Sequence, residues 1–183
     1  MYEVEVKARL KDKESVIKKL EALGCKFSEE FHQVDHIFIK KNDSFPPPLG
    51  VGVLRVRKSN DKYFFTLKIP QTSRQDCIER ELEIIEGERM IEILGLMDWV
   101  EVPTVDKKRI KTNINDIEIV LDDVKDLGEF IEAEKIVTIE DPEARKKTQE
   151  ELYSFLETLG VSKEDRVIDG KYDIMLFEKF GMK

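Results

Sequence analysis

Charged and apolar side chains alternate at the start of this sequence. Every second position from residue 3 to residue 9 carries a charge, and the positions between them are apolar. The charged residues are Glu3, Glu5, Lys7 and Arg9. Because successive side chains on a strand point to opposite faces, residues 2–10 are predicted to form a strand with one charged and one apolar face.

Seven further stretches are rich in β-branched and aromatic residues, and turn-forming residues separate them. They are residues 31–41, 52–59, 62–70, 77–85, 100–112, 117–124 and 129–139. The segment 42–50 contains three prolines, which cannot donate ladder hydrogen bonds, so it is predicted to be a loop. Short connections at 115–116 and 125–128 are typical of hairpin turns. The pattern favours an antiparallel sheet or barrel of about eight strands.

Helical periodicity appears in the segments between and after these strands. Residues 11–24 place apolar side chains at helical spacing and end on Gly24. A longer helix is predicted over 141–160, with Asp141 as N-cap and Pro142 at the first helical position. Two shorter helices are predicted, and they lie at 88–97 and 171–180. The predicted fold class is therefore α+β, with helices covering the sheet or barrel.

Composition narrows the class of protein. With 183 residues, of which 40% are hydrophobic, the chain is predicted to form one domain, residues 1–183, with a substantial core. A net charge of −8 argues against a general nucleic-acid or membrane-surface role. Two cysteines cannot build a disulfide framework, and the sequence shows neither a signal-peptide pattern nor an 18-residue apolar run. A cytoplasmic protein is expected.

The charged faces of the predicted strands combine acids and bases in equal number. The seven acids are Glu3, Glu5, Glu81, Glu83, Asp122, Glu132 and Glu134, and the seven bases are Lys7, Arg9, Arg55, Arg57, Lys68, Lys107 and Arg109. An open sheet could simply expose this mixed-charge face to water. A closed sheet would instead direct the charges into a lumen and pack the apolar faces beneath the helices. Such a lumen suits a polyanion with its metal ions, since carboxylates bind Mg²⁺ and Lys and Arg bind phosphate oxygens.

The histidines, cysteines and tryptophan give weaker indications of a functional site. His32 and His36 are four residues apart, which on a strand separates them by roughly 13 Å and disfavours a shared metal. We expect Cys25 and Cys77 to pack as small apolar groups and Trp99 to lie in the core or at an interface.

A family resemblance rests on a series of motifs that follow one another along the whole chain. The first is Glu3-x-Glu5-x-Lys7. It is followed by LRVR at 54–57, TLK at 66–68, ERELE at 79–83, Lys107-Lys108-Arg109, residues 119–134 and KYDIML at 171–176. In this order they resemble the CYTH superfamily of triphosphate tunnel metalloenzymes, and the class IV adenylyl cyclases most of all.

The resemblance implies an eight-stranded antiparallel barrel, the triphosphate tunnel, with a charged lumen, and a role for each charged residue. Mg²⁺ or Mn²⁺ would be held by Glu3, Glu5, Asp122, Glu132 and Glu134. The triphosphate would be bound by Lys7, Arg9, Arg55, Arg57, Lys68, Lys107 and Arg109, of which Lys7, Arg57 and Lys107 are expected to be catalytic. Glu81 and Glu83 would be further tunnel acids, while Asp35 and Tyr172 fit the pattern without an assigned role.

Three functions remain open on these residues. The first is conversion of ATP to cyclic AMP and pyrophosphate. The second is hydrolysis of an organic or inorganic triphosphate, such as thiamine triphosphate or tripolyphosphate. The third is a polyphosphate- or nucleotide-binding module without turnover, which so many carboxylates would disfavour. We also expect the tunnel cations to repel one another until a triphosphate binds, and the resemblance allows a homodimer.

Overall fold

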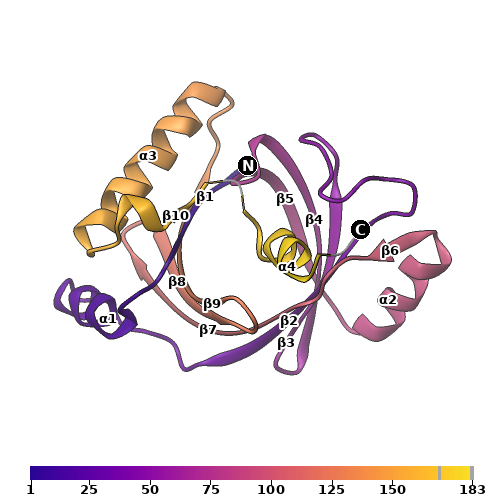
Figure 1. Ribbon diagram of the computed structural model, residues 1–183, viewed down its shortest axis with the longest axis horizontal. Helices are drawn as coiled ribbons and strands as arrows, with labels where there is room; N and C mark the ends of the chain where they lie inside the picture. Colours follow the sequence, from indigo (N-terminus) through magenta and orange to yellow (C-terminus); the bar gives the residue numbers. More distant parts are fainter. Residues whose placement is uncertain (169, 182–183) are drawn as a thin grey trace.

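Eight strands form a closed antiparallel barrel in the computed structural model, which describes residues 1–168 and 170–181. The barrel strands are β1 Tyr2–Arg9, β2 Phe31–Lys40, β3 Val53–Ser59, β4 Lys62–Ser73, β5 Asp76–Ile84, β7 Val105–Ile114, β8 Ile117–Val124 and β9 Gly128–Val137. Their order around the barrel is β1-β5-β4-β3-β2-β7-β8-β9, and β9 pairs with β1 to close it (Figure 1). The predicted fold class is confirmed, and the open sheet is excluded.

Two short strands lie outside this ring. They are β6 Trp99–Glu101, which pairs with β2, and β10 Arg166–Val167, which pairs with the end of β1. The prediction of one strand over 100–112 is therefore wrong, because the chain leaves the ladder at Pro103, which has no N–H to donate. The strand predicted over 62–70 instead continues to Ser73, with a register irregularity after Pro70 that accommodates the proline.

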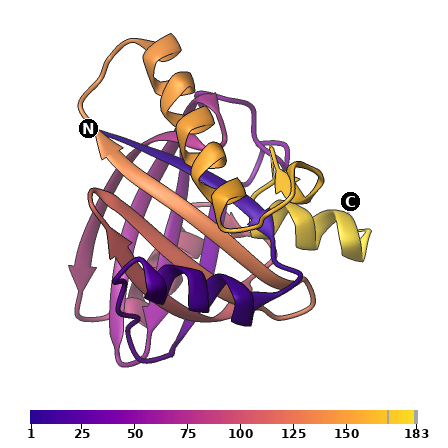
Figure 2. The same ribbon diagram turned by 90° about the vertical axis from the view of Figure 1, so that its left-hand side faces the viewer.

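Four α-helices within the described residues cover the barrel. They are α1 Lys13–Ala22, α2 Gly87–Leu96, α3 Pro142–Thr158 and α4 Tyr172–Phe180, and a short 3₁₀ turn, η1 Lys163–Asp165, follows α3. Helices α1 and α3 lie on the outside of the β1–β9–β8 wall, and α2 packs on the β2–β3–β4 side (Figures 1 and 2). Helix α4 lies at the barrel end, where Tyr172 and Leu176 pack with Val105 and Phe130. None of the described helices is long and apolar enough to cross a membrane.

The two faces of β1 show why the alternating pattern produces this fold. Val4, Val6 and Ala8 are fully buried beneath α1 and α3. Burying a valine side chain of this kind contributes about 1.5 to 3 kcal/mol. On the opposite face, Glu3 and Lys7 are also buried, with 8% and 2% of their surface exposed. The charged face therefore points into the barrel and not into bulk water.

Candidate active site

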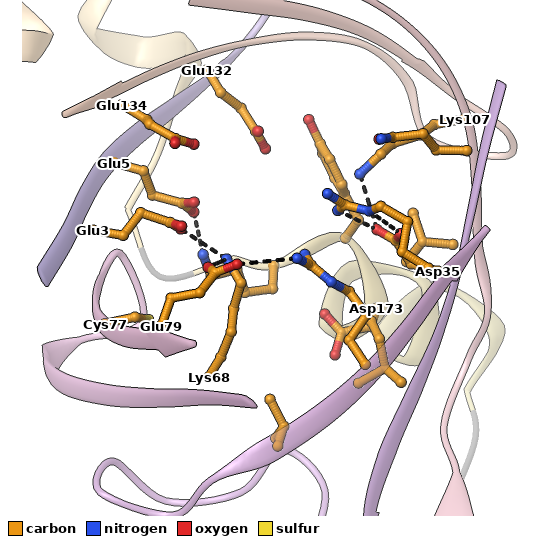
Figure 3. A pocket seen from close by; sticks show the side chains of 18 of the residues that line it. Glu3, Glu5, Asp35, Lys68, Cys77, Glu79, Lys107, Glu132, Glu134 and Asp173 are labelled. Atoms are coloured by element: carbon orange, nitrogen blue, oxygen red, sulfur yellow. Dashed lines mark hydrogen bonds and ion pairs between the residues drawn. The ribbon is translucent and has the colours of Figure 1, made fainter. Parts of the chain in front are cut away.

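The barrel encloses a cavity of about 520 Å³. All eight barrel strands contribute lining residues, and the start of α4 adds more (Figure 3). Buried charged groups interact more strongly than they would on the surface. The lumen expected from the alternating pattern is thus present, and its acids and bases face one another across it.

Three carboxylates on neighbouring strands gather on one wall of the cavity. Carboxylate oxygens of Glu3, Glu5 and Glu134 all lie within 4.8 Å of one another, because Glu5 on β1 stands directly opposite Glu134 on β9 (Figure 3). Burial and the charge of Glu3 raise the pKa of Glu134 to about 8. Hard oxygen ligands crowded in this way fit Mg²⁺ or Mn²⁺. We call Glu3, Glu5 and Glu134 the carboxylate trio.

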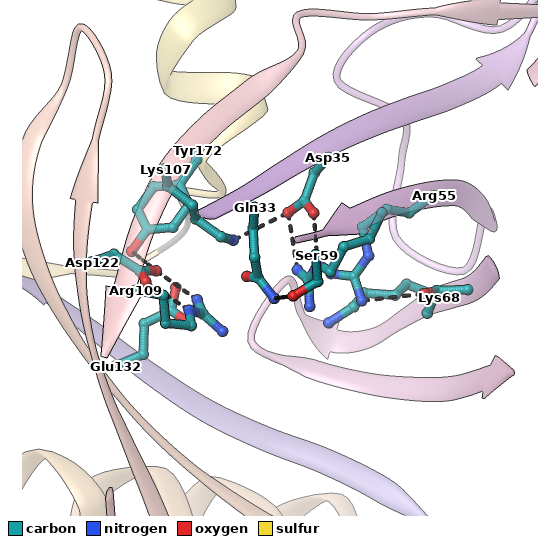
Figure 4. Close-up of polar contacts among 12 residues, drawn as sticks. Gln33, Asp35, Arg55, Ser59, Lys68, Lys107, Arg109, Asp122, Glu132 and Tyr172 are labelled. Carbon is teal, nitrogen blue, oxygen red and sulfur yellow. Dashed lines mark hydrogen bonds and ion pairs between the residues drawn. The ribbon is translucent and has the colours of Figure 1, made fainter. Parts of the chain in front are cut away.

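The two other expected metal ligands are engaged in ion pairs. Glu132 lies 2.6 Å from Lys7 and 3.0 Å from Arg109. Burial opposes its ionisation, but Lys7 and Arg109 outweigh burial and hold the pKa of Glu132 well below its ordinary value. Asp122 is fully buried and accepts two hydrogen bonds from Arg109, at 2.6 and 2.5 Å, and one from the Tyr172 hydroxyl at 3.1 Å (Figure 4). Neither residue belongs to the carboxylate trio.

A second cluster centres on Asp35. Arg57 donates to both of its carboxylate oxygens, at 2.6 and 2.9 Å, and Lys107 donates at 3.1 Å (Figure 4). The aromatic ring of Tyr172 lies 3.8 Å from the Lys7 ammonium and 5.4 Å from that of Lys107. The sequence analysis placed Asp35 in the pattern without a role, and the structure shows it lining the cavity beside Phe31, Gln33 and Ile37, with which it alternates. Its structural role is to hold two of the expected phosphate-binding cations.

The remaining cations pair with acids of β5. Arg55 lies 3.2 Å from Glu79 and 3.0 Å from Glu81, while Lys68 bridges Glu79 and Glu3. Glu79 was not selected as a site residue from the sequence, although it shares a face with Glu81. Glu83 does not line the cavity, because it lies near the end of β5, is exposed, and pairs with Lys62 at 3.1 Å.

Arg9 also lies apart from the other cations. It is exposed at the end of β1, donates to the Leu127 carbonyl at 3.2 Å and stands over the Phe130 ring. It is not among the residues that line the cavity. The alternation places Arg9 on the charged face of β1, but this residue lies beyond the end of the lumen.

Every expected clamp cation that lines the cavity already has a carboxylate partner. These cations are Lys7, Arg55, Arg57, Lys68, Lys107 and Arg109. The expectation that mutual repulsion dominates among these cations in the ligand-free protein is therefore wrong. Any anion that binds these cations must compete with these carboxylates.

The pKa of Lys107 is lowered, whereas the pKa values of Arg55, Lys68 and Arg109 are raised. Burial lowers the Lys107 pKa, Arg109 and Arg57 lower it further, and Asp35 opposes them, so that the pKa falls from 10.5 to about 8. At neutral pH Lys107 remains a charged ammonium, but keeping this charge buried lowers the stability of the folded state. Placing another anion beside the ammonium would offset this loss of stability.

The start of α4 contributes groups that no strand pattern could reveal. Lys171 forms an ion pair with Glu5, and Asp173, which is 8% exposed, also lines the cavity. Both precede or begin a helix that the sequence places far from β1. Their presence in the lumen depends on how α4 docks.

A closed antiparallel barrel with facing acids and bases in its lumen defines a class of polyanion-binding proteins, and the comparisons identify the family. The CYTH domain matches residues 1–170, so the chain belongs to the CYTH family, and the resemblance is confirmed. A protein of Methanocaldococcus jannaschii that carries the name "putative adenylate cyclase" is 34% identical over 94% of this chain and 97% of its own.

Solved structures agree with this membership. A Pyrococcus horikoshii protein is 30% identical, covers 95% of this chain and 98% of its own, and has a TM-score of 0.76. A Hippeastrum protein, described as an adenylyl cyclase candidate with a dominant triphosphatase activity, is 20% identical over 98% of this chain and 96% of its own, with a TM-score of 0.58. The second likeness shows the shared fold.

Proposed function

We propose that this protein is a metal-dependent enzyme that binds a nucleoside triphosphate in its barrel and converts ATP to cyclic AMP and pyrophosphate. One observation carries the proposal: six cations and a carboxylate trio face one another across a cavity of about 520 Å³ inside the closed barrel. The name of the Methanocaldococcus jannaschii relative, which is 34% identical, supports the cyclase reaction.

The cations supply the phosphate clamp. Arg55 and Arg57 can each direct two N–H groups at one phosphate, while Lys68 acts as a point charge. Lys7, Arg57 and Lys107 would touch the reacting phosphate and stabilise the charge that develops there. Asp35 would keep Arg57 and Lys107 oriented until the triphosphate arrives.

The carboxylate trio is the proposed metal site. Glu3, Glu5 and Glu134 would hold Mg²⁺ or Mn²⁺, which when bound would supply positive charge that offsets the negative charge of the leaving group. Glu132 and Asp122 hold Arg109 at the cavity wall, and Glu132 also pairs with Lys7. Asp122 would become available as a further metal ligand only after Arg109 moves to a phosphate, and Glu132 only after both Arg109 and Lys7 do.

The nucleoside end is proposed at an apolar part of the wall. Phe31 begins β2 and Phe64 lies near the start of β4, and both are half-buried and line the cavity. The turn between β3 and β4 joins these ends, since the Asn60 N–H donates to the His32 carbonyl. Aromatic rings of this kind stack nucleobases without reading their identity. In the cyclisation, the ribose 3′-oxygen loses its proton and bonds to the α-phosphorus, while the bond from that phosphorus to the pyrophosphate oxygen breaks.

The second candidate function is triphosphate hydrolysis. It is favoured because all six clamp cations address phosphate and none addresses a nucleoside. The Hippeastrum protein with its dominant triphosphatase activity also shares this fold. The same clamp would then direct water at the terminal phosphate.

Product analysis separates the two reactions. Purified protein is incubated with ATP, thiamine triphosphate or tripolyphosphate, each with Mg²⁺ or Mn²⁺, and products are resolved by ion-exchange chromatography. Cyclic AMP with pyrophosphate establishes the cyclase, and orthophosphate establishes the hydrolase. Tight binding without turnover on any of the three would overturn both in favour of a binding module. EDTA and the Glu5→Gln variant serve as controls for metal dependence.

A further inference from the structure

One cation enters the carboxylate trio from outside the barrel wall. The Lys171 ammonium is in ion-pair contact with Glu5, and the Lys171 side chain is 21% exposed. Burial disfavours its charge, but the Glu5 carboxylate more than offsets burial and raises the Lys171 pKa. Lys171 is the N-cap residue of α4, so a helix and not a strand carries this charge.

Lys171 differs from Lys68, the other cation at the trio. Lys68 contacts Glu3 at 2.7 Å and also contacts Glu79, so it keeps a carboxylate partner if Glu3 turns to a metal. Among the described residues, Glu5 is the carboxylate with which Lys171 forms its ion pair. Losing Glu5 would leave the Lys171 ammonium without its paired anion inside the cavity.

A divalent ion at the trio conflicts with this arrangement. Mg²⁺ and Mn²⁺ need carboxylate oxygens at close to 2 Å, and Lys171 already holds the Glu5 carboxylate. The ammonium and the metal would also repel each other strongly at such short range in a poorly screened site. Lys171 must therefore move away from Glu5 for the metal to bind well.

We propose that Lys171 holds the metal position in the ligand-free protein and transfers to a phosphate oxygen of the substrate when the metal binds. This inference rests on the proposed function, because it needs both the metal at the trio and the triphosphate in the cavity. The flexible four-carbon stem of lysine allows the transfer. A phosphate that arrives with the metal is the new anion nearest to the displaced ammonium, so metal and triphosphate bind cooperatively.

The test measures Mn²⁺ binding alone and tripolyphosphate binding at saturating Mn²⁺, both by calorimetry. Replacing Lys171 by Met removes the competing charge, so Mn²⁺ alone should bind about tenfold more tightly than to the wild type. Tripolyphosphate should bind about tenfold more weakly, because one phosphate partner is lost. Lys171→Arg should retain wild-type behaviour in both titrations.

Two controls keep the outcomes distinct. Lys179 lies on the same helix and donates to the Asp126 carbonyl outside the lumen, so Lys179→Gln should match the wild type in both titrations and shows whether α4 docking alone matters. Glu5→Gln should lose Mn²⁺ binding. If Glu5→Gln loses Mn²⁺ binding but Lys171→Met binds Mn²⁺ no more tightly than the wild type, the Lys171 inference is overturned and the proposed function stands. Unchanged tripolyphosphate affinity in Lys171→Met would overturn the transfer to phosphate. If the wild type binds no Mn²⁺, or Glu5→Gln binds it equally well, the metal site and the inference both fail.

Discussion

Proton uptake at Lys107 offers the sharpest test of the clamp. The Lys107 side chain is buried beside Asp35, Arg57 and Arg109, and its pKa falls from 10.5 to about 8. That fall corresponds to about 3 kcal/mol by which the ammonium is disfavoured in the folded protein. A bound triphosphate favours the ammonium, so it should raise the Lys107 pKa. At any pH where Lys107 is unprotonated in the free protein, binding should therefore take up a proton from solution.

The sign of the effect on stability follows from linkage. Because the folded pKa of Lys107 is below the unfolded one, the unfolded chain binds more protons between about pH 8 and 10.5. The free energy of unfolding should therefore rise with pH across that window, by at most about 1.4 kcal/mol per pH unit. Ligand affinity should change in the opposite direction and fall as pH rises above about 8.

Calorimetry in two buffers of different ionisation enthalpy counts the protons. At pH 8.5 a group with a pKa of about 8 is about three-quarters unprotonated, so tripolyphosphate binding should take up about 0.7 proton through Lys107. Arginine stays charged at this pH, and methionine cannot be charged. Lys107→Arg and Lys107→Met should both lack that uptake. Subtracting the proton count of each variant from that of the wild type removes the contribution of the ligand's own ionisation. Equal proton counts in all three proteins at pH 8.5 would refute the reasoning.

The remaining predictions concern the metal, the clamp and the nucleoside end. Glu5→Gln should abolish turnover while the protein stays folded, because an amide keeps the shape of the side chain but loses the charge that binds the ion. Glu83→Gln, which lies outside the cavity, is the matched control. Activity retained in folded Glu5→Gln would contradict the metal assignment. Arg57→Ala should lower the free energy of unfolding by about 3 kcal/mol in denaturant titrations, because buried Asp35 would keep only Lys107 as an ion-pair partner. The same variant should show a smaller thermal shift with tripolyphosphate. An unchanged shift would place Arg57 outside the clamp. Phe64→Ala should weaken ATP binding by about tenfold and leave tripolyphosphate affinity unchanged; an equal loss for both ligands would exclude base stacking at Phe64.

The Arg57 prediction shows how the structure changes an argument drawn from sequence. Seen as one of several clustered cations, Arg57 would be expected to destabilise the ligand-free protein by repulsion. The structure pairs it with Asp35 through two hydrogen bonds. Removing one partner of a buried ion pair leaves the other charge uncompensated, so the sign of the expected stability change reverses.

The alternating pattern of the chain is enough to establish which side chains share a face. Alternation with period two predicted the apolar face of Val4 and Val6 and the charged face of Glu3, Glu5 and Lys7, and the structure shows that both faces are buried. The chain's series of motifs also pointed to the CYTH family, which the domain match over residues 1–170 confirms. Local spacing is enough for these inferences because pleating fixes side-chain direction residue by residue.

The position of each charged residue along the barrel depends on how distant strands pair. Arg9 and Glu83 have the right alternation but lie at strand ends beyond the cavity, whereas Glu79 lies within it. Period two fixes the face of a side chain but not its height in the barrel, which depends on the register between strands distant in sequence. Lys171 illustrates the same limit, since its ion pair with Glu5 joins residues 166 positions apart and exists because α4 docks at the barrel end.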